Sequence, residues 1–207
     1  MKDLLVALHV YYHDQVDWFI DRLANIAGCQ WDLVVTFSED SHQSRRKFQA
    51  FKPDVKFMTV ENVGYDVWPF IKVIKSVSLS DYAYVMKLHT KNVQPFKWKI
   101  NGLRLKGERW RNILVDSLLR TPEQFSRCMD IFKEKPRTGL VCSYELCVGL
   151  SRRYPEDTYL LSEEAERIGI KSKTGRFCAG TMFIVRTECL DMIAGAHLDS
   201  SMWTSDS

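Results

Sequence analysis

Apolar runs alternate with helix-like stretches along most of the chain. The run at residues 4–11 is almost continuously apolar, which is typical of a strand buried on both faces of a sheet. In the stretch 14–27 apolar side chains recur every three or four positions, and Gly28 follows as a helix stop. The same patterns predict strands at 31–38, 55–60, 82–90, 138–144 and 178–186, and helices at 41–51, 66–74, 108–120, 121–132, 158–168 and 188–193.

This alternation favours one α/β domain over residues 1–207, with a mostly parallel central sheet flanked by helices. A length of 207 residues and a hydrophobic content of 45% suit a single core. The polar, aperiodic ending at 199–207 fits either a frayed tail or a truncation point, so the chain is also read as a possible piece of a longer protein. No apolar run approaches the roughly 20 residues of a membrane span.

Cysteine usage and charge narrow the classes of function. The six cysteines include no C-x-x-C pair, which argues against a zinc site or a disulfide framework and favours reduced thiols in a cytoplasmic protein. A net charge of +3 is too small to indicate nucleic-acid binding. Motifs of serine hydrolases, P-loop enzymes and typical NAD-binding enzymes are absent from the sequence.

The stretch from Lys91 to Arg111 is more basic than the chain as a whole. This stretch holds seven basic residues and one acid, a net +6, and its part at 92–107 lacks a clean period and predicts a long loop. Lysines interleaved with Phe96 and Trp98 suit a clamp on a sugar diphosphate, contact with anionic lipid, or single-stranded nucleic acid. A solvated charged loop is the plain alternative.

Polar side chains follow three predicted strands at the point where each strand ends. Ligands of open α/β sheets bind beyond the carboxyl ends of the strands, so these clusters predict one common site. The clusters are Tyr11, Tyr12 and His13; Asn62, Gly64 and Asp66; and His89, Thr90 and Lys91.

The second cluster predicts an anion site at a helix N-terminus. Gly64 permits a turn that a β-carbon would resist, and the helix that begins near Asp66 would aim backbone amides at the ligand. The alternative is that Asn62 and Asp66 only satisfy the turn and cap the helix.

The third cluster supplies cations. Lys87, His89 and Lys91 alternate onto one face of their strand and would neutralise a diphosphate, each contact contributing about 1.5–3 kcal/mol. A solvated strand edge is the competing interpretation. No H-x-x-x-H or H-x-H partner makes His89 a zinc ligand, and no metal site is indicated.

At these residues the chain resembles the rhamnan synthesis protein F family, whose members assemble bacterial polysaccharide or lipopolysaccharide. The motifs that carry the resemblance are Leu8-His9-Val10-Tyr11-Tyr12, Asn62-x-Gly64-x-Asp66-x-x-Pro69-Phe70, Lys87-Leu88-His89-Thr90-Lys91, Trp110-Arg111 and Ala179-Gly180-Thr181-Met182-Phe183. More distantly, it is similar to GT-A-type glycosyltransferases, whose corresponding strand ends in a metal-holding Asp-x-Asp. His89-Thr90-Lys91 stands there instead. The resemblance therefore implies a Rossmann-like GT-A-type fold, a nucleotide-diphospho-sugar donor, and charge neutralisation by side chains, with a divalent metal not signalled.

The resulting hypothesis is a cytoplasmic glycosyltransferase, possible also at the inner face of the membrane, that moves a sugar such as rhamnose to a glycan acceptor. The catalytic candidates are Asp66, as donor-binding carboxylate or general base, and His89 and Lys91, which would stabilise the leaving diphosphate. The donor-binding candidates are Tyr11, Tyr12, Asn62, Gly64, Lys87, Thr90, Arg109, Arg111, Gly180 and Thr181. A non-catalytic glycan or nucleotide-sugar binding module is the alternative, and a nucleic-acid partner is not expected.

Overall fold

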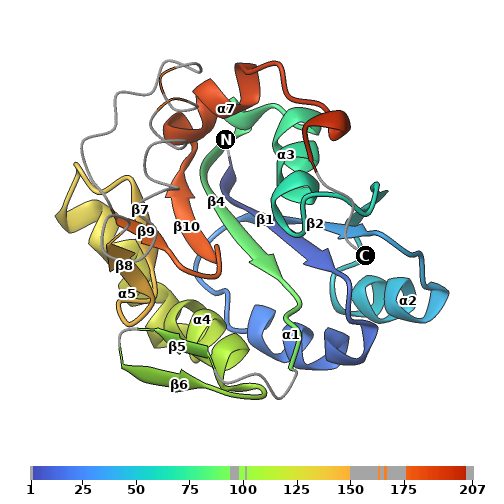
Figure 1. Ribbon diagram of the computed structural model, residues 1–207, viewed down its shortest axis with the longest axis horizontal. Coiled ribbons are helices and arrows are strands. Elements are labelled where there is room, and N and C mark those ends of the chain that lie inside the picture. Colours follow the sequence, from blue (N-terminus) through green and yellow to red (C-terminus); the bar gives the residue numbers. More distant parts are fainter. Residues whose placement is uncertain are drawn as a thin grey trace.

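A six-stranded sheet forms the centre of the computed structural model, which describes residues 2–93, 98–100, 102–149, 163, 166 and 176–203 (Figure 1). The strand order is β3-β2-β1-β4-β10-β7. The first four neighbours run parallel, and β10 runs antiparallel to β4 and to β7. The strands span β1 Lys2–Val10, β2 Trp31–Phe37, β3 Lys56–Thr59, β4 Tyr82–His89, β7 Leu140–Cys142 and β10 Phe183–Arg186. The predicted mixed α/β fold with a mostly parallel sheet is confirmed.

Helices cover both faces of the sheet because its central strands are apolar on both faces. Leu4, Val6 and Leu8 of β1 pack into one core cluster, and Leu5 and Ala7 pack into the other. The first cluster is covered by α1 Val16–Leu23, α2 His42–Phe51, α4 Arg109–Leu119 and α5 Pro122–Glu134, and the second by α3 Val67–Ser76 and α7 Asp191–Gly195 (Figure 1). Short 3-10 turns η1 His13–Gln15, η2 Leu79–Asp81, η3 Thr187–Leu190 and η4 Ser200–Met202 complete the described elements.

Helix ends follow the local sequence. The Ser41 hydroxyl accepts a hydrogen bond from the Ser44 amide at the start of α2. The Thr121 hydroxyl does the same for the Gln124 amide at the start of α5, where Pro122 occupies the first helical position. The helices predicted at 41–51 and 121–132 therefore correspond to α2 and α5.

Two predicted elements are wrong. The stretch 92–107 is not a structureless loop, because it contains an antiparallel hairpin of β5 Trp98–Ile100 and β6 Leu103–Leu105. The segment 178–186 is not one strand: β9 Arg176–Cys178 pairs with β8 Cys147–Gly149 in a separate two-stranded sheet, and a turn at Gly180 precedes β10. The helix predicted at 158–168 lies outside the described residues apart from two isolated positions.

The described part of the chain contains no helix with the length and apolar character of a membrane span.

Candidate functional site

An ionic cluster lies where β4, the start of α3 and the turn before β10 meet. The Lys87 ammonium donates a hydrogen bond to the Asp66 carboxylate, and the Thr181 hydroxyl donates to the same carboxylate oxygen. Lys87 Nζ also lies 3.0 Å from the Thr181 carbonyl oxygen and 3.0 Å from Thr181 Oγ1. Three residues that are distant in sequence therefore share one network, and all three were predicted site residues.

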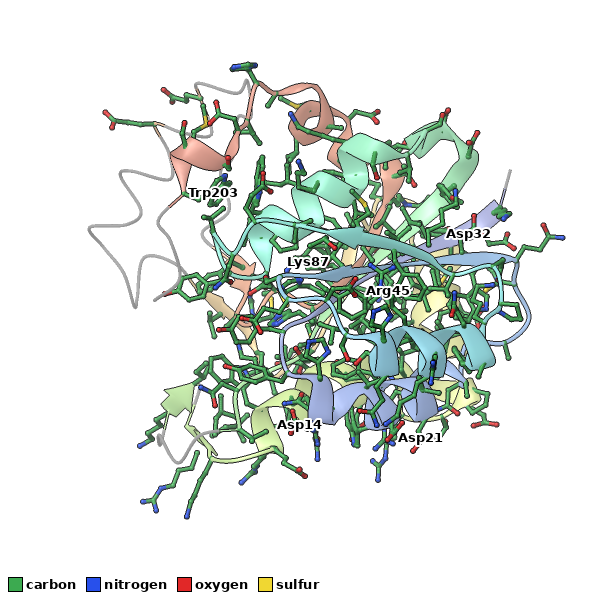
Figure 2. The ribbon with its side chains drawn as sticks, turned by 90° about the vertical axis from the view of Figure 1, so that its right-hand side faces the viewer. Asp14, Asp21, Asp32, Arg45, Lys87 and Trp203 are labelled. Atoms are coloured by element: carbon green, nitrogen blue, oxygen red, sulfur yellow. The ribbon has the colours of Figure 1, made fainter. Side chains whose placement is uncertain are left out.

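Lys87 and Asp66 form a largely buried ion pair, so each charge depends on the other for compensation. The Lys87 side chain, labelled in Figure 2, is only 3% exposed, and the Asp66 side chain is 17% exposed. Burial lowers the pKa of Lys87 while the charge of Asp66 raises it. Burial alone would raise the pKa of Asp66, but His89, Lys87 and the Thr181 hydroxyl together hold it well below its usual range. Asp66 is therefore an ionised partner of Lys87 and a weak proton acceptor.

His89 lies next to this pair. Its Nε2 is 3.6 Å from the Asp66 carboxylate and 2.9 Å from the Gly180 carbonyl oxygen, and its Nδ1 is 3.0 Å from the Thr90 carbonyl oxygen. Burial lowers the pKa of His89 to about 4, against the raising effect of Asp66. The ring is then neutral near pH 7 and donates one hydrogen bond, so the positive charge of the site comes from its lysines.

A left-handed turn brings the backbone to these side chains. Gly180 has φ 98° and Thr181 has φ 51°, a conformation that residues with a β-carbon seldom adopt. A β-carbon on Gly180 would lie 2.7 Å from the Leu114 side chain, so a glycine is needed there for space as well. The turn directs the carbonyl oxygen of Gly180 to His89 and that of Thr181 to Lys87.

Lys91 is the cation of the site for which the described residues provide no counterion. Its Nζ lies 3.9 Å from the centroid of the Trp110 ring, and no carboxylate of the described residues is within ion-pairing distance of it. Its backbone is fixed by Gln15, whose side chain accepts from the Lys91 amide and donates to the Lys91 carbonyl. Burial lowers the pKa of Lys91 and Asp66 raises it, which places Lys91 within the field of the ion pair.

Thr90 ties the end of β4 to the end of β1. Its hydroxyl oxygen accepts hydrogen bonds from the amides of Tyr11 and Tyr12, at 2.9 and 3.0 Å. The Tyr11 side chain is 48% exposed, and the two tyrosine rings stack edge to face. The predicted convergence of these clusters at the carboxyl edge of the sheet is thus confirmed for strands β1 and β4.

The predicted anion site at the start of α3 is wrong in its donors. The amides of Val67 and Trp68 both donate to the Gly64 carbonyl, and Pro69 has no N–H, so none of the three residues that open α3 offers a free amide. Asp66 makes no side-chain capping bond. Gly64 does form a left-handed turn with φ 63°, but the Trp203 ring covers it and would lie 2.8 Å from a β-carbon. Asn62 is exposed on the same turn.

The two arginines of α4 are not joined to the Lys87–Asp66 ion pair by the contacts that the structure describes. Arg111 is buried, with its guanidinium 4.0 Å from the centroid of the Trp18 ring and 3.3 Å from the Glu108 carboxylate. Arg109 is exposed at the start of the helix. The structure does not join either residue to Asp66.

His9 was missed as a site residue. It lies directly opposite His89 in the parallel pairing of β1 with β4, and its Nδ1 is 2.9 Å from Thr36 Oγ1 of β2. Burial, together with the neighbouring His89, lowers the pKa of His9 to about 4. The signal was a polar residue inside an otherwise apolar strand, which a buried parallel sheet tolerates only when the residue is hydrogen-bonded.

The donor set at this site does not suit a divalent cation. Asp66 is the carboxylate here, and the groups nearest to it are an ammonium and an imidazole. No group of three or more His, Cys, Asp or Glu side chains with metal-binding geometry occurs in the described residues. What the site offers a ligand is positive charge.

Comparison with known proteins agrees with these motifs. Residues 1–202 match the family described as rhamnan synthesis protein F. The chain belongs to this family. The match includes the ends of β1 and β4, the Asp66 turn and the Gly180 turn, so the site described above lies within the shared region. The description of the family refers to rhamnan synthesis.

Two relatives extend the comparison. The chain is 26% identical over 211 residues to uncharacterized protein WxcX of Xanthomonas campestris pv. campestris strain B100, and to its counterpart in strain ATCC 33913. Each alignment covers 97% of this chain and 28% of the relative. The chain therefore spans little more than a quarter of the length of the curated relatives that it matches.

Proposed function

We propose that this chain is a glycosyltransferase domain that transfers a sugar from a nucleotide-diphosphate donor to a glycan acceptor during polysaccharide synthesis. The single observation that carries the proposal is Lys91, a partly buried cation without a carboxylate partner in the described residues, at the carboxyl edge of the sheet. A buried cation in this position is compensated when an anionic ligand arrives. The family name supports rhamnose as the sugar. The mostly parallel sheet with polar residues at its carboxyl edge supports a GT-A-type fold within the same proposal.

The reaction requires charge compensation more than covalent chemistry. The bond between the sugar C1 and the β-phosphate oxygen breaks, an acceptor hydroxyl oxygen bonds to C1, and its proton leaves to a base or to solvent. The diphosphate departs with the electron pair of the broken bond. Lys91 would stabilise that developing charge by a charge-assisted contact of about 1.5–3 kcal/mol.

The neighbouring residues have supporting roles in this proposal. Asp66 holds the Lys87 ammonium in place, and Thr181 supplies a hydroxyl and a carbonyl to the same group. The neutral imidazole of His89 positions the Gly180 turn. Tyr11 and Tyr12, fixed through Thr90, would contact the nucleobase side, with Asn62 and Gly64 shaping the facing turn.

A non-catalytic binding module is the second candidate, and one observation favours it. The Asp66 carboxylate is already engaged by Lys87 and Thr181, so the site presents no free carboxylate that could take the acceptor proton. Such a module would bind the donor and leave it intact.

Titration calorimetry with nucleotide diphospho-sugars, followed by product analysis with a glycan acceptor, tests both candidates. We expect a nucleotide diphospho-rhamnose to bind, and Lys91→Met to weaken binding by about 10-fold to 100-fold, the loss of one charge-assisted contact. Lys47→Met is the matched control, because Lys47 pairs with the exposed Asp17. Binding without sugar transfer would favour the module. Absence of binding to any nucleotide diphospho-sugar, or equal loss in the control, would remove both.

A further inference from the structure

The β5–β6 hairpin carries a basic face that the site described above does not use. In its register Lys99 lies directly opposite Arg104, while Ile100 lies opposite Leu103. Because side chains alternate between the two faces of a strand, the two cations share one face and the apolar residues share the other.

The apolar face anchors the hairpin to the molecule. Ile100 and Leu105 are 5% and 1% exposed and belong to the core cluster under α4, and Leu103 packs against the same cluster. The opposite face is exposed to solvent at Lys99 and Arg104. Changes on this outer face are therefore not expected to unfold the hairpin.

The basic face breaks an ordinary rule of sheet design. Like charges directly across a strand pair are destabilising, and Lys106 and Arg109 add two exposed cations immediately after the hairpin. No carboxylate of the described residues ion-pairs with Arg104, Lys106 or Arg109. Among the described residues, Arg104, Lys106 and Arg109 therefore remain available to an anionic partner.

The position of this face relates it to Lys91. The hairpin lies between the end of β4 and the start of α4, and Figure 1 shows it at the rim of the molecule beside α4. Trp110, one residue after Arg109, is the ring on which Lys91 rests. The exposed cations are thus continuous along the chain with the wall of the candidate site.

We propose that the basic face of Lys99, Arg104, Lys106 and Arg109 docks this domain on the surface of an anionic phospholipid bilayer. Charge complementarity favours this occupant, because exposed cations on the hairpin and directly after it can each meet a lipid phosphate, and each strengthens binding about fivefold. Docking would bring the candidate site close to an acceptor carried by a lipid. This consequence rests on the proposed function.

Flotation with vesicles tests the docking without any substrate. The wild-type chain is mixed with vesicles of phosphatidylcholine alone, or with about one third phosphatidylglycerol, at low and at high salt. We expect flotation only with the anionic vesicles, and release by high salt. Arg104→Gln/Lys106→Gln should weaken the partition about 25-fold, two cations at about fivefold each. Arg127→Gln/Lys135→Gln, at exposed positions within α5 and directly after it, removes the same charge elsewhere and should leave flotation unchanged.

The outcomes separate this proposal from the proposed function. No flotation with anionic vesicles, or equal losses in both double variants, would overturn docking. Stronger binding to a single-stranded oligonucleotide than to anionic vesicles would overturn it in favour of a nucleic-acid partner. Donor affinity, measured by calorimetry without vesicles, reports on the proposed function alone, so either idea can fail while the other stands.

Discussion

Replacing Asp66 by asparagine should strongly destabilise the fold, because it leaves Lys87 buried without its counterion. The change keeps the shape of the side chain and removes the charge that the 3%-exposed Lys87 needs. Breaking a buried ion pair costs about 3–5 kcal/mol, and we expect about 3 kcal/mol here because solvent reaches the Asp66 side, which is 17% exposed. Neutralising a lysine at pH 7 costs about 5 kcal/mol from its usual pKa, which sets the upper limit.

Urea and thermal unfolding at pH 7 measure this effect. A loss of 3 kcal/mol corresponds to a fall of about 6–12 °C in Tm for a chain of this size. The control is Asp17→Asn, which breaks the exposed pair with Lys47 and should cost under about 1 kcal/mol. Lys87→Met in the Asp66→Asn background should recover at least about 1 kcal/mol relative to additivity, because it removes the orphaned charge.

The pH dependence of the free energy of unfolding gives an independent test of the same ion pair. The pKa of Asp66 is lower in the folded state than in the unfolded chain, so its contribution is complete above the ordinary value of 3.8 and is lost as the pH falls below it. The difference between wild type and Asp66→Asn should be constant between pH 5 and 7 and shrink in acid. A penalty below about 1 kcal/mol at pH 7, or no recovery in the double variant, would refute the ion-pair reasoning.

Three further predictions concern the same region. Gly180→Ala should cost about 1–3 kcal/mol in urea unfolding, because it adds left-handed strain and a contact at 2.7 Å; an unchanged midpoint would contradict the turn geometry. Stability should fall between about pH 6.5 and 4, because burial lowers the pKa of His9 and of His89 to about 4 and the unfolded chain then binds more protons; His9→Gln should flatten this slope, and an unchanged slope would count against it. Gly64→Ala should destabilise through its clash with Trp203, and Trp203→Ala should relieve part of that loss; simple additivity of the two changes would rule out the contact.

Strand positions were predictable because buried parallel strands have a strong local signal. The predicted strand at 31–38 matches β2 Trp31–Phe37, and that at 4–11 overlaps β1 Lys2–Val10, since near-continuous apolar runs mark strands with both faces covered. The turn at Gly180 was hidden because Ala179 and Met182 on either side keep the segment apolar, and a left-handed backbone leaves no trace in hydrophobicity. Strands of three residues, such as β5 and β6, are too short to show any period.

The candidate site was predictable in its location and less so in its contacts. Polar residues at the carboxyl ends of β1 and β4 meet because parallel strands end at one edge, which fixes Tyr11, Tyr12 and Thr90 together. The position of a basic residue on a helix sets no such constraint on where its long side chain lies. Arg111 lies over Trp18 because its position on α4 faces α1, a choice that depends on helix packing and not on the local sequence.

At Asp66, an ion pair with a residue distant in sequence prevails over helix capping, because the ion pair is worth more energy than the cap. An aspartate at the start of a helix caps it for about 1 kcal/mol, which made capping a reasonable expectation. Lys87, however, lies between Met86 and Leu88 in a strand covered on both faces, so its ammonium had to be buried and had to find a carboxylate. Leaving that ammonium unpaired would cost several times the energy of a cap. The carboxylate therefore turns to Lys87 and leaves the helix uncapped by its side chain, and the same demand keeps the start of α3 fixed against the end of β4.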